Sequence, residues 1–189
     1  MRVFIAVELD ARCRDAAVTT ANELRRQLDG GSSWKWVATE NMHVTVRFIG
    51  HVPNERVGEV LAALAVPLLV EPFDLVLGQP GIFPLAGTPR VLWIGLDHGL
   101  ESLAAMHAEF NRRLQGLGFE PEGRAFSAHV TLARAKDTRS RGGGDVRKVV
   151  RQITCAPARC RISHATTFES RPSPRGPQYV SIAQTRLEP

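Results

Sequence analysis

Two short apolar segments each combine a histidine with a threonine two positions later. They read HVTV, beginning at His43, and HVTL, beginning at His129. Alternate side chains of a β-strand point to the same face, so each histidine is predicted to share a face with Thr45 or Thr131. The aliphatic residues between them then pack into the core. If the two strands lie side by side, two imidazoles and two hydroxyls meet in one cleft.

These residue types suit the cleavage of a phosphodiester. A neutral imidazole can take a proton from water while a protonated one gives a proton to the leaving oxygen, because the histidine pKa lies near neutrality. Threonine hydroxyls can donate hydrogen bonds to the phosphate oxygens, where negative charge grows in the transition state. No carboxylate accompanies either pair, so the sequence predicts acid–base chemistry without a metal site or another cofactor.

A third His-x-Thr occurs at His164 and Thr166. It lacks the flanking aliphatic residues of the other two, and its histidine alternates with Ile162 and Phe168, so His164 is as consistent with packing as with catalysis. Spacing alone leaves this open. Position favours His43 and His129 as the catalytic pair, because only they follow a strand-then-helix unit. The remaining histidines, His51, His98 and His107, are predicted to be surface residues.

Three neighbours of the motifs are candidate substrate-binding residues. Arg47 is in phase with His43 and is expected to face the same ligand. Phe48 is out of phase, which favours packing in the core, with stacking on a nucleobase as the alternative. Arg134 is also out of phase with its histidine, so a bulge or the end of the strand must redirect it if it binds phosphate.

Composition restricts the partner and the compartment. The formal charge of +5 comes with many arginines and favours an anionic partner. The three cysteines include no CxxC, and the first residues lack the apolar stretch of a secretory signal, so a reducing cytoplasm is predicted. Cys155 and Cys160 have no second Cys/His pair nearby to complete a zinc site. No apolar run reaches the roughly 18 residues of a membrane span.

The pattern along the chain predicts an α+β (or α/β-like) protein built from two similar halves. We expect one bilobal domain over residues 1–189. Strands are predicted at 3–9, 43–49, 73–79, 90–96, 129–133, 161–169 and 178–185, and helices at 11–28, 54–64, 100–117 and 146–153, with Asn54 as an N-cap and a glycine-rich loop at 136–145.

At these residues the chain resembles the two-histidine (2H) phosphoesterase superfamily, whose members carry two H-x-T-x motifs. It is most similar to the LigT-like RNA 2′,3′-cyclic phosphodiesterases, also described as 2′-5′ RNA ligases. Supporting segments span nearly the whole chain: MRVFIAVEL, NMHVTVRFIG, GIFP, PRVLWIGL, AHVTLARAK and FESRPSPRGPQY. One departure is Ser127-Ala128 before the second histidine, where relatives often have a proline.

The resemblance implies two pseudo-symmetric lobes, each with an antiparallel sheet and helices, facing a central groove. It implies metal-independent hydrolysis of a 2′,3′-cyclic phosphate to a 2′-phosphate, with reversible 2′-5′ ligation as an associated possibility. His43 would protonate the leaving 3′ oxygen and His129 would activate water. Thr45 and Thr131 would hold the phosphate, and Arg134 matches a family position near it.

Two other functions remain open on the sequence. One is a phosphodiesterase for another small cyclic phosphate or a 2′-5′ oligonucleotide, and the other is a non-catalytic RNA-binding module, which the basic charge alone would fit. Further candidate RNA contacts are Tyr179, Arg175, the tryptophans Trp34 and Trp36, and the arginines of residues 139–147. We expect a monomer that does not bind a membrane.

Overall fold

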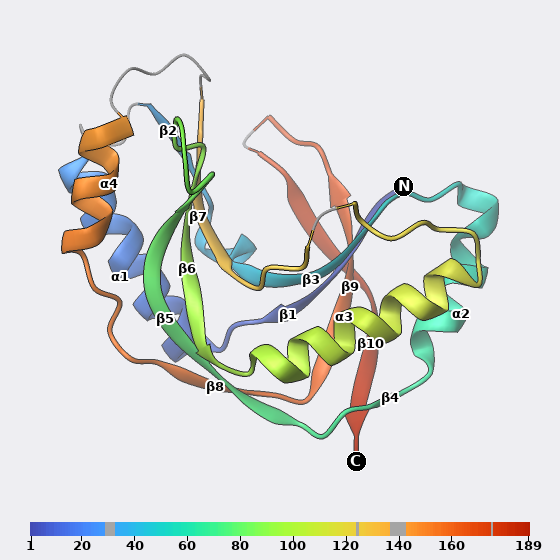
Figure 1. The fold of residues 1–189 in the computed structure, drawn as a ribbon. Helices are drawn as coiled ribbons and strands as arrows, with labels where there is room; N and C mark the ends of the chain where they lie inside the picture. The colour runs from blue at the N-terminus through green and yellow to red at the C-terminus, as the bar shows by residue number, and fades with distance from the viewer. Residues whose placement is uncertain (29–32, 124, 137–142, 175) are drawn as a thin grey trace.

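The computed structural model describes residues 1–28, 33–123, 125–136, 143–174 and 176–189. Figure 1 shows its strands and helices. The strands are β1 (Arg2–Glu8), β2 (Trp34–Trp36), β3 (His43–His51), β4 (Leu68–Leu69), β5 (Phe73–Phe83), β6 (Val91–His98), β7 (Val130–Ala135), β8 (Arg159–Ile162), β9 (His164–Arg171) and β10 (Gln178–Glu188). The helices are α1 (Ala11–Gln27), α2 (Val57–Ala65), α3 (Leu100–Gln115) and α4 (Gly143–Gln152), with short 3₁₀ turns η2 (Thr39–Asn41) and η3 (Asn54–Arg56).

The strands form two groups that meet at β3 and β7. The order across the sheet is β4-β10-β9-β1-β3-β7-β6-β5-β8, and β2 pairs with β7 off this path. All pairs in this order are antiparallel except β10 with β4. Only Val44 and Val130 pair between β3 and β7, so the two groups are joined at one point. The predicted two-lobed α+β architecture is confirmed.

The long helix of each half of the chain packs against strands of the other half. α1 follows β1 but packs against β7 and β8, whereas α3 follows β6 but packs against β3 (Figure 1). α4 joins α1, and α2 joins α3. Four apolar residues of α3, Leu103, Met106, Phe110 and Leu114, are buried. This exchange buries the apolar face of each helix against a sheet that its own half does not supply.

Three element predictions need correction. Residues 161–169 are not one strand, because the strand is interrupted at Ser163. β8 pairs with β5 and β9 pairs with β1, so the chain passes from one lobe to the other at this residue. Asn54 does not cap α2 but opens η3, and no side chain caps either element. α4 begins at Gly143, three residues before the predicted start, and the rest of the predicted glycine-rich loop, at 137–142, lies outside the described residues.

Bulges interrupt both motif strands just after the threonine. In β3 the pairing with β1 steps from Thr45 to Arg47, and in β7 the pairing with β6 steps from Thr131 to Ala133. The skipped residues, Val46 and Leu132, are buried, and so are the residues that follow them. Each bulge therefore reverses the alternation of side chains beyond the motif.

None of the helices described has the length and apolar character needed to cross a bilayer.

Candidate active site

The two motif histidines are held by the same local arrangement. Nδ1 of His43 lies 2.7 Å from the Asn41 carbonyl oxygen, and Nδ1 of His129 lies 2.7 Å from the Ser127 carbonyl oxygen. A carbonyl oxygen only accepts, so Nδ1 carries the hydrogen in both rings. In the neutral form, Nε2 is then left with its lone pair, which is the atom that can exchange protons with a ligand.

The threonines complete the repeated site. Thr45 Oγ1 lies 3.0 Å from Nε2 of His43, so the hydroxyl donates to the neutral imidazole. Val44 lies directly opposite Val130, and in this antiparallel register His43 is set toward Thr131 and Thr45 toward His129. The register brings both motifs together.

A cavity of about 880 Å³ opens beside these residues. Thr45, His129, Thr131 and Arg134 all contribute to its wall. His43 is not part of the wall and lies behind Thr45, to which it is hydrogen-bonded. The volume is at the upper end of the range for small-ligand sites, so there is room for more than a cyclic phosphate.

Aromatic side chains surround both imidazoles. The His43 ring lies 5.0 Å from the Phe4 ring and 5.4 Å from that of Tyr179, while His129 lies 5.2 Å from Phe83 and 6.2 Å from Trp93. Burial lowers the pKa of His43 to about 4 and also lowers the pKa of His129, because the charged form loses hydration. Both imidazoles are therefore neutral at pH 7 before a ligand binds.

The bulge in β3 reverses the expected positions of Arg47 and Phe48. Arg47 is buried and does not line the cavity; its guanidinium donates to the carbonyls of Phe48 and Glu120 and lies 3.6 Å from a Glu122 carboxylate oxygen. The expectation that it faces the ligand is wrong. Phe48 is 49% exposed and lines the cavity, so its expected packing in the core is also wrong.

Arg134 reaches the cavity because of the matching bulge in β7. Thr131 pairs with Trp93 and Arg134 pairs with Val91, which are two residues apart, so both side chains share a face. A bulge was one of the two features expected to redirect Arg134, which strict alternation places on the opposite face from His129, and β7 contains one. Arg134 follows His129 by the same number of residues as Phe48 follows His43. The two residues therefore occupy equivalent positions in the two halves, and one gives the cavity a cation and the other an aromatic ring.

Two supporting residues were not recognised in the sequence. His107, predicted to be at the surface, is half-buried on α3: its Nδ1 donates to the carbonyl of Val46 at 2.7 Å, and its ring stacks on Phe126 at 4.4 Å. Glu122 accepts a hydrogen bond from the Phe48 backbone N–H at 2.8 Å. Both contacts brace the β3 bulge. They join residues more than sixty positions apart, and no local pattern signals them.

The other candidate contacts lie outside the cavity wall. His164 pairs with Arg186 and is not part of the cavity wall. Trp34 is a core residue, and the Trp36 ring is covered by the Arg25 guanidinium at 5.1 Å. Tyr179 touches His43 but does not line the cavity. Arg175 and the arginines at 139 and 141 are outside the described residues, and Arg147 bonds to the β5–β6 turn.

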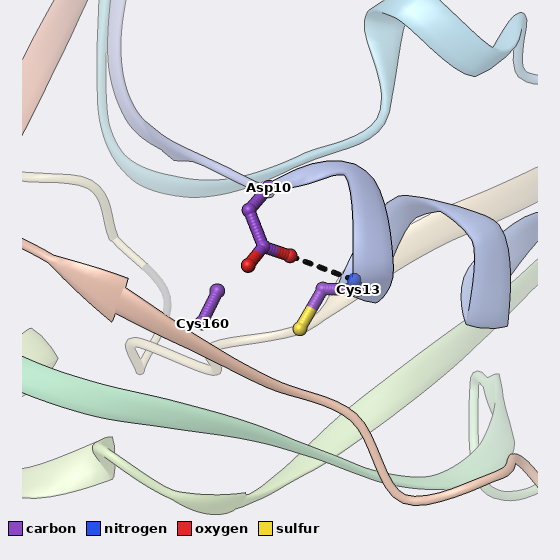
Figure 2. A group of neighbouring side chains, drawn as sticks. All are labelled: Asp10, Cys13 and Cys160. Carbon is purple, nitrogen blue, oxygen red and sulfur yellow. Dashed lines mark hydrogen bonds between the residues drawn. The ribbon is translucent and has the colours of Figure 1, made fainter.

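Within the described part of the chain, one group of side chains has the composition of a metal site. Asp10, Cys13 and Cys160 bring their ligand atoms within 4.8 Å of one another at the start of α1 (Figure 2). The Asp10 carboxylate accepts the Cys13 backbone N–H at 2.8 Å and so caps the helix. Burial raises the pKa of both thiols, which keeps them protonated at pH 7. None of the three lines the cavity.

Comparison with known proteins agrees with this geometry. The model of the LigT like phosphoesterase family matches residues 13–93 and 94–179. A protein of Aeropyrum pernix named RNA 2′,3′-cyclic phosphodiesterase is 38% identical over 69% of this chain and 68% of its own length. One of the same name from Archaeoglobus fulgidus is 30% identical over 96% of this chain and 98% of its own.

A solved structure supports the same assignment. The crystal structure of TT0787 of Thermus thermophilus superposes with a TM-score of 0.78 at 27% identity, covering 99% of this chain and 98% of that one. The family model matches once in each half, which agrees with the duplicated motifs. Sequence, site and fold together show that this chain belongs to the LigT-like phosphoesterases of the two-histidine superfamily.

Proposed function

We propose that this protein hydrolyses the 2′,3′-cyclic phosphate at the end of an RNA to a 2′-phosphate. The supporting observation is the pairing of β3 with β7, which brings the two histidine–threonine pairs together beside one cavity, whose wall includes His129, both threonines and Arg134. The names of the relatives from Aeropyrum and Archaeoglobus support the same substrate.

The reaction needs one proton acceptor and one proton donor. His129 takes a proton from water as its oxygen attacks phosphorus, and His43 gives a proton to the 3′ oxygen as the P–O3′ bond breaks. Water is consumed, and the products are a 2′-phosphate and a 3′-hydroxyl. Thr45, Thr131 and Arg134 donate hydrogen bonds to the non-bridging oxygens, where charge increases. Phe48 offers an exposed ring for stacking a base.

The neighbours of the histidines act on both pKa values. Burial lowers the pKa of His43, the positive charge of Arg134 lowers it further, and Glu8, opposite His43 in the β1–β3 pair, raises it. Burial and Arg134 also lower the pKa of His129, which favours the neutral form that a base needs. Because His43 has a pKa of about 4 in the free protein, its role as the acid requires the bound phosphate to raise that value.

Nuclear magnetic resonance titration of the imidazoles tests that requirement. In the free protein we expect His43 to titrate well below pH 6.5, with the neutral form populated above its pKa. Saturating inorganic phosphate should raise its pKa, because an anion stabilises the imidazolium. A His43 pKa that phosphate leaves unchanged, beside a raised His129 pKa, would reverse the assignment of acid and base.

A product assay tests the reaction itself. The protein is incubated with EDTA and an oligoribonucleotide ending in a 2′,3′-cyclic phosphate, and the phosphate isomer of the product is identified. We expect a 2′-phosphate, formed at the same rate with and without the chelator. RNA binding without turnover would support a binding module instead, and loss of activity in EDTA would contradict metal-independent catalysis.

Both motifs belong to one chain, so this site needs no second copy. The monomeric state remains a prediction. The three cysteines are unpaired thiols, which supports the predicted reducing cytoplasm.

A further inference from the structure

The cavity extends past the two motifs to the turn between β5 and β6. On that side its wall includes Phe83, Thr88 and Arg90, none of which belongs to a His-x-Thr segment. Two arginines, Arg90 and Arg134, therefore line one cavity. The proposed reaction uses only Arg134, which leaves a cation in the wall without a role.

Hydrogen bonds hold the turn in place. The Arg90 backbone N–H donates to the Phe83 carbonyl at 2.7 Å, and the Ala135 N–H donates to the Arg90 carbonyl at 2.9 Å. Arg147 on α4 donates to the carbonyls of Leu85 and Gly87 at 2.5 and 2.6 Å. The backbone of Arg90 is thus fixed relative to β7, the strand that carries His129 and Arg134.

The Arg90 side chain is exposed and has no carboxylate partner among the residues that the structure describes. Other exposed arginines, such as Arg112 and Arg171, are paired with a glutamate on their own element. An unpaired guanidinium in a cavity wall retains all its donors for an anionic ligand, and its planar fork matches two oxygens of a phosphate.

The spacing of the two arginines indicates which phosphate Arg90 meets. Val91, the next residue after Arg90, pairs with Arg134 on the neighbouring strand, and neighbouring strands lie about 4.8 Å apart. The two side chains therefore start from adjacent backbones, and because both line the same cavity, they offer an RNA end two cationic groups for successive phosphates. A nucleoside 2′,3′-cyclic phosphate has only one phosphate, whereas an RNA end has a second at its 5′ side.

We propose that Arg90 binds the phosphodiester that precedes the terminal nucleotide, which makes an oligoribonucleotide a better substrate than a nucleoside cyclic phosphate. This inference rests on the proposed function, since it takes the cyclic phosphate to lie between His43 and His129. Arg90 then acts as a specificity residue. It holds the RNA strand and does not contact the reacting atoms.

The test compares two substrates and two variants. The substrates are adenosine 2′,3′-cyclic phosphate, which has no 5′-phosphate, and the dinucleotide adenylyl-adenosine 2′,3′-cyclic phosphate. In Arg90→Gln we expect kcat/KM for the dinucleotide to fall about 10-fold more than for the mononucleoside, mainly through KM, as for a charged hydrogen bond. Arg186→Gln, which removes an exposed positive charge on β10, is the matched control and should preserve the ratio of the two substrates.

The outcomes separate this inference from the proposed function. An equal loss on both substrates in Arg90→Gln would mean that Arg90 acts at the reacting phosphate, and an unchanged ratio with no loss would mean that it contacts neither. Either result, in the presence of wild-type turnover, overturns the role of Arg90 alone. A wild-type protein that hydrolyses neither substrate would overturn the proposed function and this inference with it.

Discussion

Alanine at His43 or at His129 is expected to lower kcat/KM for a 2′,3′-cyclic phosphate end by at least about 10²-fold, the low end for losing general acid or base catalysis. Each imidazole presents Nε2 to the reaction because its Nδ1–H is bonded to a backbone carbonyl two residues earlier. Water or another side chain cannot replace a proton-transfer group held in this geometry without a large loss of rate. The measurement is steady-state hydrolysis of an RNA oligomer with a cyclic end.

His164→Ala is the matched control for this prediction. It removes the histidine of the third His-x-Thr segment, which lies on β9 away from the cavity wall. Its kcat/KM should stay within a few-fold of wild type. A loss comparable to that of His43→Ala would show that the catalytic pair has been chosen wrongly, provided that thermal unfolding shows the variant to be folded.

Valine at Thr45 or Thr131 is expected to lower kcat by about 10²-fold, the cost of removing one donor to a developing oxyanion. Valine keeps the size and the β-branch of threonine, so the strand and its pairing are retained. Serine at the same positions keeps the hydroxyl and should recover most of the rate. If valine and serine were equally slow, packing of the methyl group and not hydrogen bonding would be the cause.

The two threonine variants should differ in their pH dependence. Thr45 donates to Nε2 of neutral His43, so removing its hydroxyl takes away a hydrogen bond that favours the neutral ring. The pKa of His43 should then rise, and the profile of kcat/KM for Thr45→Val should move to higher pH. No such bond joins Thr131 to His129 in the described structure, so the profile of Thr131→Val should keep its position.

The bulges in β3 and β7 determine which side chains line the cavity beside the motif residues. Strict alternation predicts Arg47 in the cavity and Phe48 and Arg134 out of it, and the structure has the reverse in all three cases. One extra residue in each strand accounts for every difference. The β3 bulge is stabilised by His107 and Glu122, which come from distant parts of the chain, so the residues around His43 show no sign of it.

The motif strands, their shared faces and the two-lobed class could all be predicted from the amino-acid sequence. Those features follow from alternation and helical periodicity, which act over a few residues and are therefore visible in the pattern of side chains. The repeated His-x-Thr segments also indicated the chemistry, because the same four groups had to meet across two similar halves.

How the halves combine became visible only in three dimensions. Pairing partners are chosen over long distances in the chain: α1 packs on the lobe of β7, α3 packs on the lobe of β3, and Ser163 divides one apparent strand between the two. The same long-range pairing sets the bulges that bring Phe48 and Arg134 into the cavity and bury Arg47. The local sequence does not predict these partners or bulge positions, because the free energy of each arrangement depends on burial against a segment distant in the chain.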